Sequence, residues 1–250
     1  MGLFGSIFFK KESKKEPFDL STLAVDMHSH LIPGIDDGSK SMDETIAMLA
    51  KFESLGFKKV ITTPHIMSDY FRNTPEIILD GLEKVRTELK RIHLNIEFEA
   101  AAEYYFDETL MAKLKNKEKL LTFGDNYVLF EFSFHSEPSQ IDALFFEMIT
   151  QNYKPVLAHF ERYVFLHGSI DKAIEWRSKG INIQLNYNSL FGHYGPEVQR
   201  QARELVNSGE IDFVATDCHR IEHLMTLEQN LSDNYLHKLG ELNLKNSSLV

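Results

Sequence analysis

Nine side chains of the types that bind metal ions stand at or near the C-terminal ends of successive predicted strands. They are His28, His30, Asp37, His65, Glu103, Glu131, His159, Asp217 and His219. Because residues i and i+2 of a strand point to the same face, His28 and His30 project together, as do Asp217 and His219. Two such pairs, with imidazoles and carboxylates from five other positions, indicate a site for more than one metal ion.

The carboxylate of Glu131 is the hardest of these groups to explain as purely structural. The stretch 127–132 is otherwise apolar on both faces, as expected of a buried parallel strand. An isolated carboxylate there would cost several kcal/mol or become protonated, unless an ion pair or a metal ion compensates its charge. A buried ion pair is the alternative interpretation, and we favour metal binding.

Two of the histidines are ambiguous when taken alone. His65 and His159 each follow an apolar stretch, 60–64 and 155–158. A single histidine in such a place is more often a hydrogen-bonded core residue than a ligand. Because the other predicted strands also end in ligand-type residues, we interpret both as ligands.

Two ligand positions have close competitors. Glu99 and Glu103 share one face of a predicted strand, and Glu103 lies nearer the C-terminal end, where ligands are expected. Asp36 and Asp37 lie in a turn, where aspartates usually bond the local backbone, and the sequence does not choose between them. Asp26 lies on the same face as His28 and is expected to orient an imidazole.

The ligand chemistry narrows both the metal and the reaction. Imidazoles and carboxylates without thiolates suit Mn²⁺, Zn²⁺ or Fe rather than a structural zinc site built from cysteine. With about three protein ligands per ion, the set can hold two or three ions, which usually activate water and neutralise a phosphate. The sequence therefore predicts hydrolysis of a phosphate ester. Arg162, close after His159, could bind that phosphate through its planar guanidinium, and a surface ion pair with Glu161 or another acid is the alternative.

The ligands require a scaffold that brings several strand ends together. Seven apolar stretches predict strands, with helical patterns between them: 23–28, 59–63, 95–101, 127–132, 155–159, 181–186 and 211–217. This alternation predicts an α/β fold with a parallel sheet, and a closed barrel is favoured because function lies at the C-terminal ends of barrel strands. We expect one domain over 23–250, after a flexible N-terminal extension over 1–22.

Local signals mark where several helices begin. Ser41 and Glu44 fit a capping box, and Gly56 is expected to end that helix. Thr74 and Pro75 place a proline at the first helical position of the next. Further starts are predicted at Pro138, Ser169 and Pro196.

The composition excludes several classes of protein. The net charge of −10 argues against a nucleic-acid surface, which needs a basic footprint. No stretch approaches the roughly 18 apolar residues of a membrane span. The single cysteine, Cys218, allows no internal disulfide and indicates a reducing compartment. A cysteine-dependent tyrosine phosphatase needs an arginine where this chain has Leu224, so we expect Cys218 to be a buried side chain.

The first residues carry a short modification motif. The stretch 1–6 matches the N-myristoylation pattern, and an apolar patch and four lysines follow it over 7–15. A solvated tail is the favoured interpretation. An arm that binds an anionic membrane surface or a partner is the alternative.

Taken together, these segments resemble the polymerase and histidinol phosphatase (PHP) superfamily, and within it the CpsB/CapC group of bacterial manganese-dependent protein-tyrosine phosphatases. The matching segments span about residues 24 to 230: 26–30, 33–38, 63–65, 102–105, 131–133, 158–163 and 216–219. The resemblance implies a distorted (β/α)₇ barrel of the PHP fold with a trinuclear site held by all nine residues named first. It matches Arg162 to a phosphate-contacting arginine. A further arginine of the family has no clear equivalent, and Arg220 or His223 could replace it.

The same resemblance implies an activity. A member of this group hydrolyses phosphotyrosine in proteins with Mn²⁺, in the cytoplasm, on a tyrosine kinase that controls export of surface polysaccharide. His219, Arg220 or a metal-bound water would then protonate the departing tyrosyl oxygen. The alternatives are a phosphatase for small molecules such as histidinol phosphate, and a degenerate barrel that only docks a partner. A homo-oligomer is left open.

Overall fold

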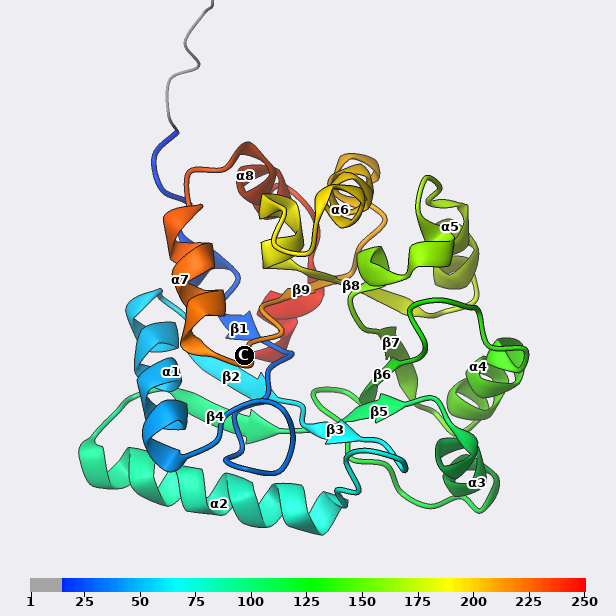
Figure 1. Ribbon diagram of the computed structural model, residues 1–250, viewed down its shortest axis with the longest axis horizontal. Helices are drawn as coiled ribbons and strands as arrows, with labels where there is room; N and C mark the ends of the chain where they lie inside the picture. The colour runs from blue at the N-terminus through cyan, green and yellow to red at the C-terminus, as the bar shows by residue number, and fades with distance from the viewer. Residues whose placement is uncertain (1–14) are drawn as a thin grey trace, which may run out of the picture.

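The strands run parallel around a common centre, and the helices lie outside them (Figure 1). The computed structural model describes residues 15–250. The strands are β1 (Val25–Asp26), β2 (Lys59–Thr62), β3 (His65–Ile66), β4 (Glu97–Ala100), β5 (Glu103–Tyr105), β6 (Tyr127–Glu131), β7 (Lys154–Leu157), β8 (Asn182–Asn186) and β9 (Phe213–Ala215). All ladders between these strands are parallel, which confirms the predicted α/β class.

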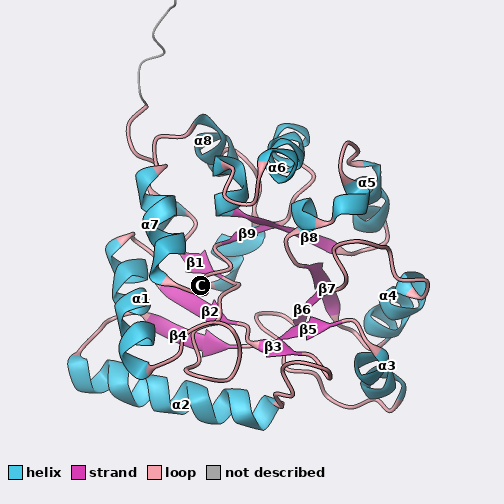
Figure 2. Ribbon diagram, in the orientation of Figure 1, coloured by secondary structure: helices cyan, strands magenta, loops and turns pink. Residues whose placement is uncertain are grey.

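The helices follow the strands in alternation and form the outer layer (Figure 2). They are α1 (Met42–Ser54), α2 (Pro75–Ile92), α3 (Glu108–Lys115), α4 (Ile141–Thr150), α5 (Asp171–Ser178), α6 (Pro196–Ser208), α7 (Ile221–Gln229) and α8 (Asn234–Gly240). The described residues also form short 3-10 turns, which are η1 (Leu20–Thr22), η2 (Phe160–Arg162), η3 (Val164–Leu166), η4 (Tyr187–Phe191) and η5 (Lys245–Leu249).

The local helix signals act partly as predicted. The Ser41 side chain accepts a hydrogen bond from Glu44 N at 3.2 Å, although the Glu44 carboxylate turns to Lys40 N rather than to Ser41. Thr74 caps α2 ahead of Pro75. The helices predicted at Pro138 and Ser169 begin slightly later, at Ile141 and Asp171, while α6 begins at Pro196.

The strands form two hydrogen-bonded sheets, with orders β1-β2-β4 and β3-β5-β6-β7-β8-β9. The segment that follows β1 joins the two at one end. His30 N donates to Cys218 O at 2.8 Å, Asp217 N donates to His28 O at 2.9 Å, and Thr63 N donates to Ser29 O at 2.6 Å. Hydrogen bonding is therefore continuous across the C-terminal ends of β1, β2 and β9, where the candidate ligands stand.

Two predicted strands continue past an interruption. The expected strands ended before His65 and Glu103, but the chain resumes as β3 and β5 after breaks at 63–64 and 101–102. Pro64 has no N–H to donate, yet its carbonyl accepts from Glu103 N at 3.1 Å. In the ladder that follows, His65 lies opposite Glu103, so the break positions two candidate ligands side by side.

The space enclosed by the strands is filled with apolar side chains below the candidate site. Ile61, Leu129, Val156 and Phe213 are fully buried there, in one cluster with Ala215. A larger cluster packs between the strands and the outer helices. Along β6 the side chains of Leu129 and Glu131 point the same way, so the ligand carboxylate stands directly above this apolar floor.

Residues 15–22, the described part of the expected extension, contact the domain. Phe18 N donates to Leu231 O at 2.8 Å, and Leu20 is buried. The acylation motif expected over 1–6, and most of the lysine-rich stretch after it, lie outside the described residues. Among residues 15–250, no helix is long and apolar enough to cross a membrane.

The side chain of Asn246 fills a gap between β1 and β9 at their N-terminal ends. Its Oδ1 accepts from Val214 N at 3.0 Å, and its Nδ2 donates to Val25 O at 3.0 Å and to Val214 O at 2.7 Å. Asn246 is fully buried, so these backbone groups have no access to water. The C-terminal turn η5 thus replaces a missing strand pairing with one amide.

Replacing Asn246 with Ala should destabilise the fold by about 3 kcal/mol, because it leaves buried backbone groups without partners. Urea unfolding followed by circular dichroism would measure the change. Ser247→Ala, an exposed neighbour in the same turn, is the control and should unfold like the unmodified protein. Equal midpoints for the two variants would contradict this role.

Candidate metal centre

All nine predicted ligands come together at one end of the strands. Their ligand atoms form four overlapping groups, each with atoms within 4.8 Å of one another: His30, Asp37, His65 and His219; His28, His30 and Glu103; His28, His159 and Asp217; and His65, Glu103 and Glu131. Several residues belong to two groups. Such sharing is expected where carboxylates and imidazoles surround neighbouring ions rather than one.

Glu103 lies at the centre of this arrangement. Its Oε2 is 3.3 Å from His28 Nε2, 3.4 Å from His30 Nε2 and 3.1 Å from His65 Nδ1, while its Oε1 is 3.1 Å from His159 Nε2. The side chain is 1% exposed. One carboxylate thus faces four imidazoles away from water, as a bridging ligand would.

Two of the ligand-type residues have an unusual backbone conformation. His159 has φ +33° and Asp217 has φ +50°, the left-handed region that residues other than glycine rarely occupy. Each stands just after a strand, β7 or β9, and the conformation turns its side chain into the cluster. Strain of about 1–3 kcal/mol per residue is common at functional sites.

The turn after β1 uses both of its aspartates. Asp36 Oδ2 lies 2.8 Å from His30 Nδ1 and orients that ring, while Asp37 Oδ1 lies 3.5 Å from His65 Nε2 and 3.4 Å from His219 Nε2. Gly38 allows the turn, because a Cβ there would lie 2.1 Å from His30 O. Asp37 is therefore the ligand-type residue, and Asp36 supports the His30 ring.

The structure also separates the other competing acids. Glu99 lies outside the cluster, 2.9 Å from Lys59 Nζ, so Glu103 is the residue that faces the histidines. The expectation that Asp26 orients an imidazole is wrong. Its carboxylate accepts from Thr216 N at 2.7 Å and from Thr216 Oγ1 at 3.1 Å instead.

The predicted strand 181–186 supplied no candidate ligand. In the structure it forms β8 and provides supporting groups that the sequence interpretation missed. On β8, Gln184 Oε1 accepts from His159 N at 2.8 Å, and Gln184 Nε2 donates to Asn186 Oδ1 at 2.8 Å. Asn186 Nδ2 then donates to Asp217 Oδ2 at 2.9 Å. The i, i+2 spacing of these two amides, on a strand where they alternate with Ile183 and Leu185, was the signal that could have revealed them.

This chain of amides determines which nitrogen of His28 holds a proton. Because His159 N already donates to Gln184 Oε1, that oxygen is an acceptor. His28 Nδ1, 3.1 Å away, must therefore be the N–H donor. Its Nε2 faces Glu103 Oε2 at 3.3 Å, so this is the nitrogen that would bind a metal ion after losing its proton.

Arg162 points to the cluster and not to Glu161. Its Nη1 donates to Asp217 Oδ2 at 3.1 Å, and its guanidinium lies 4.6 Å from the ring centres of both Phe134 and Tyr194. Glu161 is buried and accepts from Asn186 N at 3.0 Å. The alternative of an ion pair with Glu161 is therefore wrong, whereas an ion pair with another acid does form, with the buried Asp217.

The cluster has one edge open to solvent. Asp37 is 57% exposed, His219 is 19% exposed, and Arg162 is 25% exposed. Arg220 is exposed at the start of α7 and lines, with Asp37 and His219, a surface hollow of 360 Å³. His223 is buried behind this edge, its Nδ1 3.1 Å from Asp217 O.

Cys218 is unsuited to nucleophilic chemistry. It is fully buried, with its Sγ 3.7 Å from Met48 Sδ. Burial raises the pKa of its thiol well above the usual range, so the reactive thiolate does not form near neutral pH.

A model of the family described as "Capsular polysaccharide synthesis, CpsB/CapC" matches residues 24–242. The chain belongs to the CpsB/CapC family. The resemblance inferred from the sequence is thereby confirmed, and the matched residues include all nine ligand-type side chains and Arg162.

Relatives within the family are named as phosphatases. The putative tyrosine-protein phosphatase CapC of Staphylococcus aureus is 29% identical over 232 residues, 90% of each chain. The tyrosine-protein phosphatase CpsB of Streptococcus pneumoniae is 28% identical over 86% of this chain and 91% of its own. A structure described as YwqE from Bacillus subtilis and CpsB from S. pneumoniae, "unique metal-dependent tyrosine phosphatases", superposes with a TM-score of 0.73 at 24% identity, covering 89% of this chain and 94% of that one.

The donor set of this CpsB/CapC chain fits divalent metal ions. Five imidazoles and four carboxylates, with no thiolate among them, suit Mn²⁺, Zn²⁺ or Fe. Glu103 Oε2 is buried without a hydrogen-bond partner, although four imidazoles surround its carboxylate. Burying an ionised oxygen there costs free energy unless a cation lies beside it.

In the protein without metal, protons supply that positive charge. Burial alone would lower the pKa of His28, but the carboxylates of Glu103 and Asp217 outweigh it and raise this pKa to about 9. For His65, burial is likewise outweighed by Glu103 and Glu131, which raise its pKa well above the usual value. Burial opposes ionisation of Glu103, yet the neighbouring histidines hold its pKa well below the ordinary range.

Replacing Gln184 with Leu should weaken Mn²⁺ binding about 10–100-fold, because His28 loses the amide that orients it and Asn186, which holds Asp217, loses its own partner. Isothermal titration calorimetry on the metal-free protein would measure the affinity. Gln201→Leu is the matched control, since Gln201 is an equally buried glutamine that bonds Ser169 O and Gly168 N away from the cluster. Equal affinities in the two variants would contradict the role given to Gln184.

Mn²⁺ binding at pH 7 should release protons. A ligating imidazole must be neutral, whereas the metal-free His28 has a raised pKa of about 9 and is protonated at pH 7. The apparent affinity should therefore rise as the pH increases from 7 towards 9. Calorimetry in two buffers with different ionisation enthalpies would detect the released protons, and a binding enthalpy independent of the buffer would contradict this prediction.

Proposed function

We propose that this protein is a metal-dependent phosphatase that hydrolyses phosphotyrosine in proteins. The observation that carries the proposal is the convergence of nine metal-ligand side chains beside a stacked arginine at an open edge. The names of its CpsB/CapC relatives support the same activity. The metal ions would be two or three, with Mn²⁺ as the first choice and Zn²⁺ or Fe as alternatives.

The protein's own groups would bind and orient the phosphate. Arg162 presents its guanidinium between Phe134 and Tyr194, which hold the plane in place while Asp217 anchors one nitrogen. The remaining N–H groups are free to donate to phosphoryl oxygens. Bound divalent cations would supply charge neutralisation at phosphorus and a more acidic water.

The departing tyrosyl oxygen needs a proton donor at the exposed edge. We propose His219 and Arg220 for the surface next to that oxygen, because both line the hollow of 360 Å³ beside Asp37. His219 is also a ligand-type residue, so its share in proton transfer depends on how it binds metal. The Cys218 thiol takes no part, because it is buried with a raised pKa.

The exposure of the centre favours a protein substrate over a small molecule. Small-molecule sites usually enclose 70–90% or more of the ligand surface. Here Asp37, His219 and Arg162 lie at the surface, where a phosphorylated side chain projecting from another protein can reach them. We therefore propose that histidinol phosphate and similar metabolites are poor substrates.

We propose a biological partner from the family to which the chain belongs. A tyrosine kinase that regulates capsular polysaccharide synthesis in the cytoplasm is the partner that best fits a CpsB/CapC phosphatase.

For the fold, we propose that β2 with β3, and β4 with β5, each count as one interrupted strand. The nine strands are then seven units of a distorted (β/α)₇ barrel over 23–250, preceded by the extension over 1–22.

The test is phosphate release from a phosphotyrosine peptide after chelation and then with Mn²⁺ restored. Activity should require Mn²⁺ and survive a thiol-blocking reagent. Arg162→Ala should lower kcat/KM by about 10²–10³, and Asp217→Ala should abolish it. Arg200→Ala, which removes an exposed arginine paired with Glu197, is the control and should leave activity unchanged.

Two results would overturn this function. Faster release from histidinol phosphate than from the peptide would assign a small-molecule phosphatase. No release with Mn²⁺, Zn²⁺ or Fe²⁺, in a protein that still binds these ions, would favour a docking module.

A further inference from the structure

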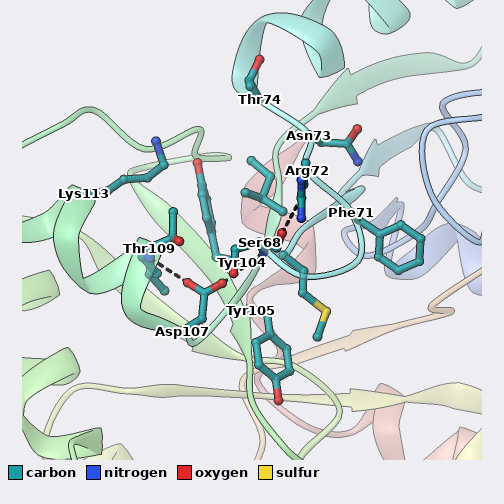
Figure 3. Close-up of a pocket in the computed structure, with 13 residues that line it drawn as sticks. Ser68, Phe71, Arg72, Asn73, Thr74, Tyr104, Tyr105, Asp107, Thr109 and Lys113 are labelled. Atoms are coloured by element: carbon teal, nitrogen blue, oxygen red, sulfur yellow. Dashed lines mark hydrogen bonds between the residues drawn. The ribbon is translucent and has the colours of Figure 1, made fainter.

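A cavity of 270 Å³ lies beside the metal centre, between the segment after β3 and the start of α3. Figure 3 shows its lining, with Phe71, Arg72 and Asn73 from one side and Tyr104, Thr109 and Lys113 from the other. Ile66, Met67 and Leu110 complete an apolar floor. Nothing in the proposed chemistry uses this cavity.

Phe71 is the wall that separates the cavity from the metal centre. Its ring stacks on the His65 imidazole, with centroids 5.2 Å apart and an interplanar angle of 11°. Two other lining residues, Ile66 and Tyr104, each follow a ligand-type residue directly, His65 and Glu103 respectively. The cavity therefore begins one aromatic ring away from the metal-binding side chains.

The wall is held in place before any ligand binds. Met67 and Phe71 exchange two backbone hydrogen bonds, both of 2.9 Å, which close the segment 67–71 into a tight loop. Asn73 Nδ2 donates to His65 O at 2.8 Å, and Ser68 N donates to Asp107 Oδ2 at 3.1 Å. A preformed site costs less ordering entropy on binding than a flexible one.

The chemistry of the cavity suits an apolar side chain. Its acid, Asp107, already accepts from Ser68 N and from Leu110 N at 2.9 Å, and the Tyr104 hydroxyl accepts from Leu121 N at 2.7 Å. Lys113 on the rim is 3.0 Å from Glu118. The volume is below the roughly 300–1,000 Å³ of a drug-sized ligand site, and is sufficient for one amino-acid side chain.

We propose that this cavity binds an apolar side chain of the substrate, located within two positions of the phosphotyrosine. In an extended peptide, side chains i and i+2 lie about 7 Å apart on one face, so a residue near the phosphotyrosine can face the cavity on one side of Phe71 while the phosphotyrosine faces His65 on the other. The exposed Arg72 at the rim adds a cation that attracts the negatively charged phosphopeptide. The proposal rests on the phosphotyrosine phosphatase function.

The test compares phosphotyrosine peptides that carry Leu, Ala or Asp at each position from −2 to +2, with para-nitrophenyl phosphate as a minimal substrate. Leu at one of these positions should raise kcat/KM about tenfold over Ala. The gain should appear in KM rather than in kcat, because the contact is the same in ground and transition states.

Thr109→Trp tests whether this cavity is the source of the preference. Thr109 is exposed on α3 and lines the cavity, so an indole there should fill it and reduce the Leu/Ala ratio to about one. Ala112→Trp places the same ring on an exposed position of α3 that does not line the cavity, and should keep the tenfold ratio.

Equal kcat/KM for the Leu and Ala peptides at all positions, with para-nitrophenyl phosphate still hydrolysed, would overturn the cavity assignment alone. An unchanged Leu/Ala ratio in Thr109→Trp would do the same, and a preference for Asp would assign the site to an acidic residue bound by Arg72. Failure to hydrolyse any peptide or para-nitrophenyl phosphate would reject the phosphatase function itself, and this inference with it.

Discussion

Four carboxylates stand together at the end of these strands only because positive charge lies between them. Two like charges about 4 Å apart repel by about 4 kcal/mol at an effective dielectric constant of 20. Glu103 is buried among four imidazoles, and Asp217 faces both His28 and Arg162. Either protons on the histidines or metal ions must compensate this charge, so metal binding and proton release are coupled in this fold.

The repulsion between these carboxylates explains why neutral amides, rather than further acids, support the ligand-type residues. Gln184 and Asn186 hold His28, His159 N and Asp217 in one hydrogen-bonded chain without adding charge. A carboxylate in the place of Gln184 would add to the repulsion. At the opposite end of the strands, Asn246 uses a neutral amide to join β1 and β9. Neutral amides thus complete the scaffold at both ends of the strands.

The loops decide what can approach the centre. Phe71 covers one side of His65, and Phe134 with Tyr194 encloses the Arg162 guanidinium. These rings stand around an edge where Asp37 is exposed. The parallel strands therefore carry the ligand-type residues, while the loops that follow these strands surround them with aromatic groups, the usual division of roles in α/β folds.

Local spacing in the sequence predicted much of the site. The i, i+2 rule paired His28 with His30, the apolar strand around Glu131 demanded a compensating charge, and Thr74 with Pro75 began a helix. The family resemblance then chose Glu103 over Glu99. These inferences succeed because backbone period and burial depend on neighbouring residues, and those are visible in one chain.

Contacts between distant strands needed the tertiary structure. The sequence interpretation expected Asp26 to orient an imidazole, but in the structure Asp26 lies beside Thr216 and accepts a hydrogen bond from its N–H. It assigned no function to the strand of Gln184, because a neutral amide has no ligand signature until His28 and His159 lie beside it. The wall formed by Phe71 depends likewise on the path of a loop. The sequence determined which side chains could bind metal. The register of the strands and the paths of the loops decided which of these side chains meet and which groups support them, because distances between strands depend on residues far apart in the chain.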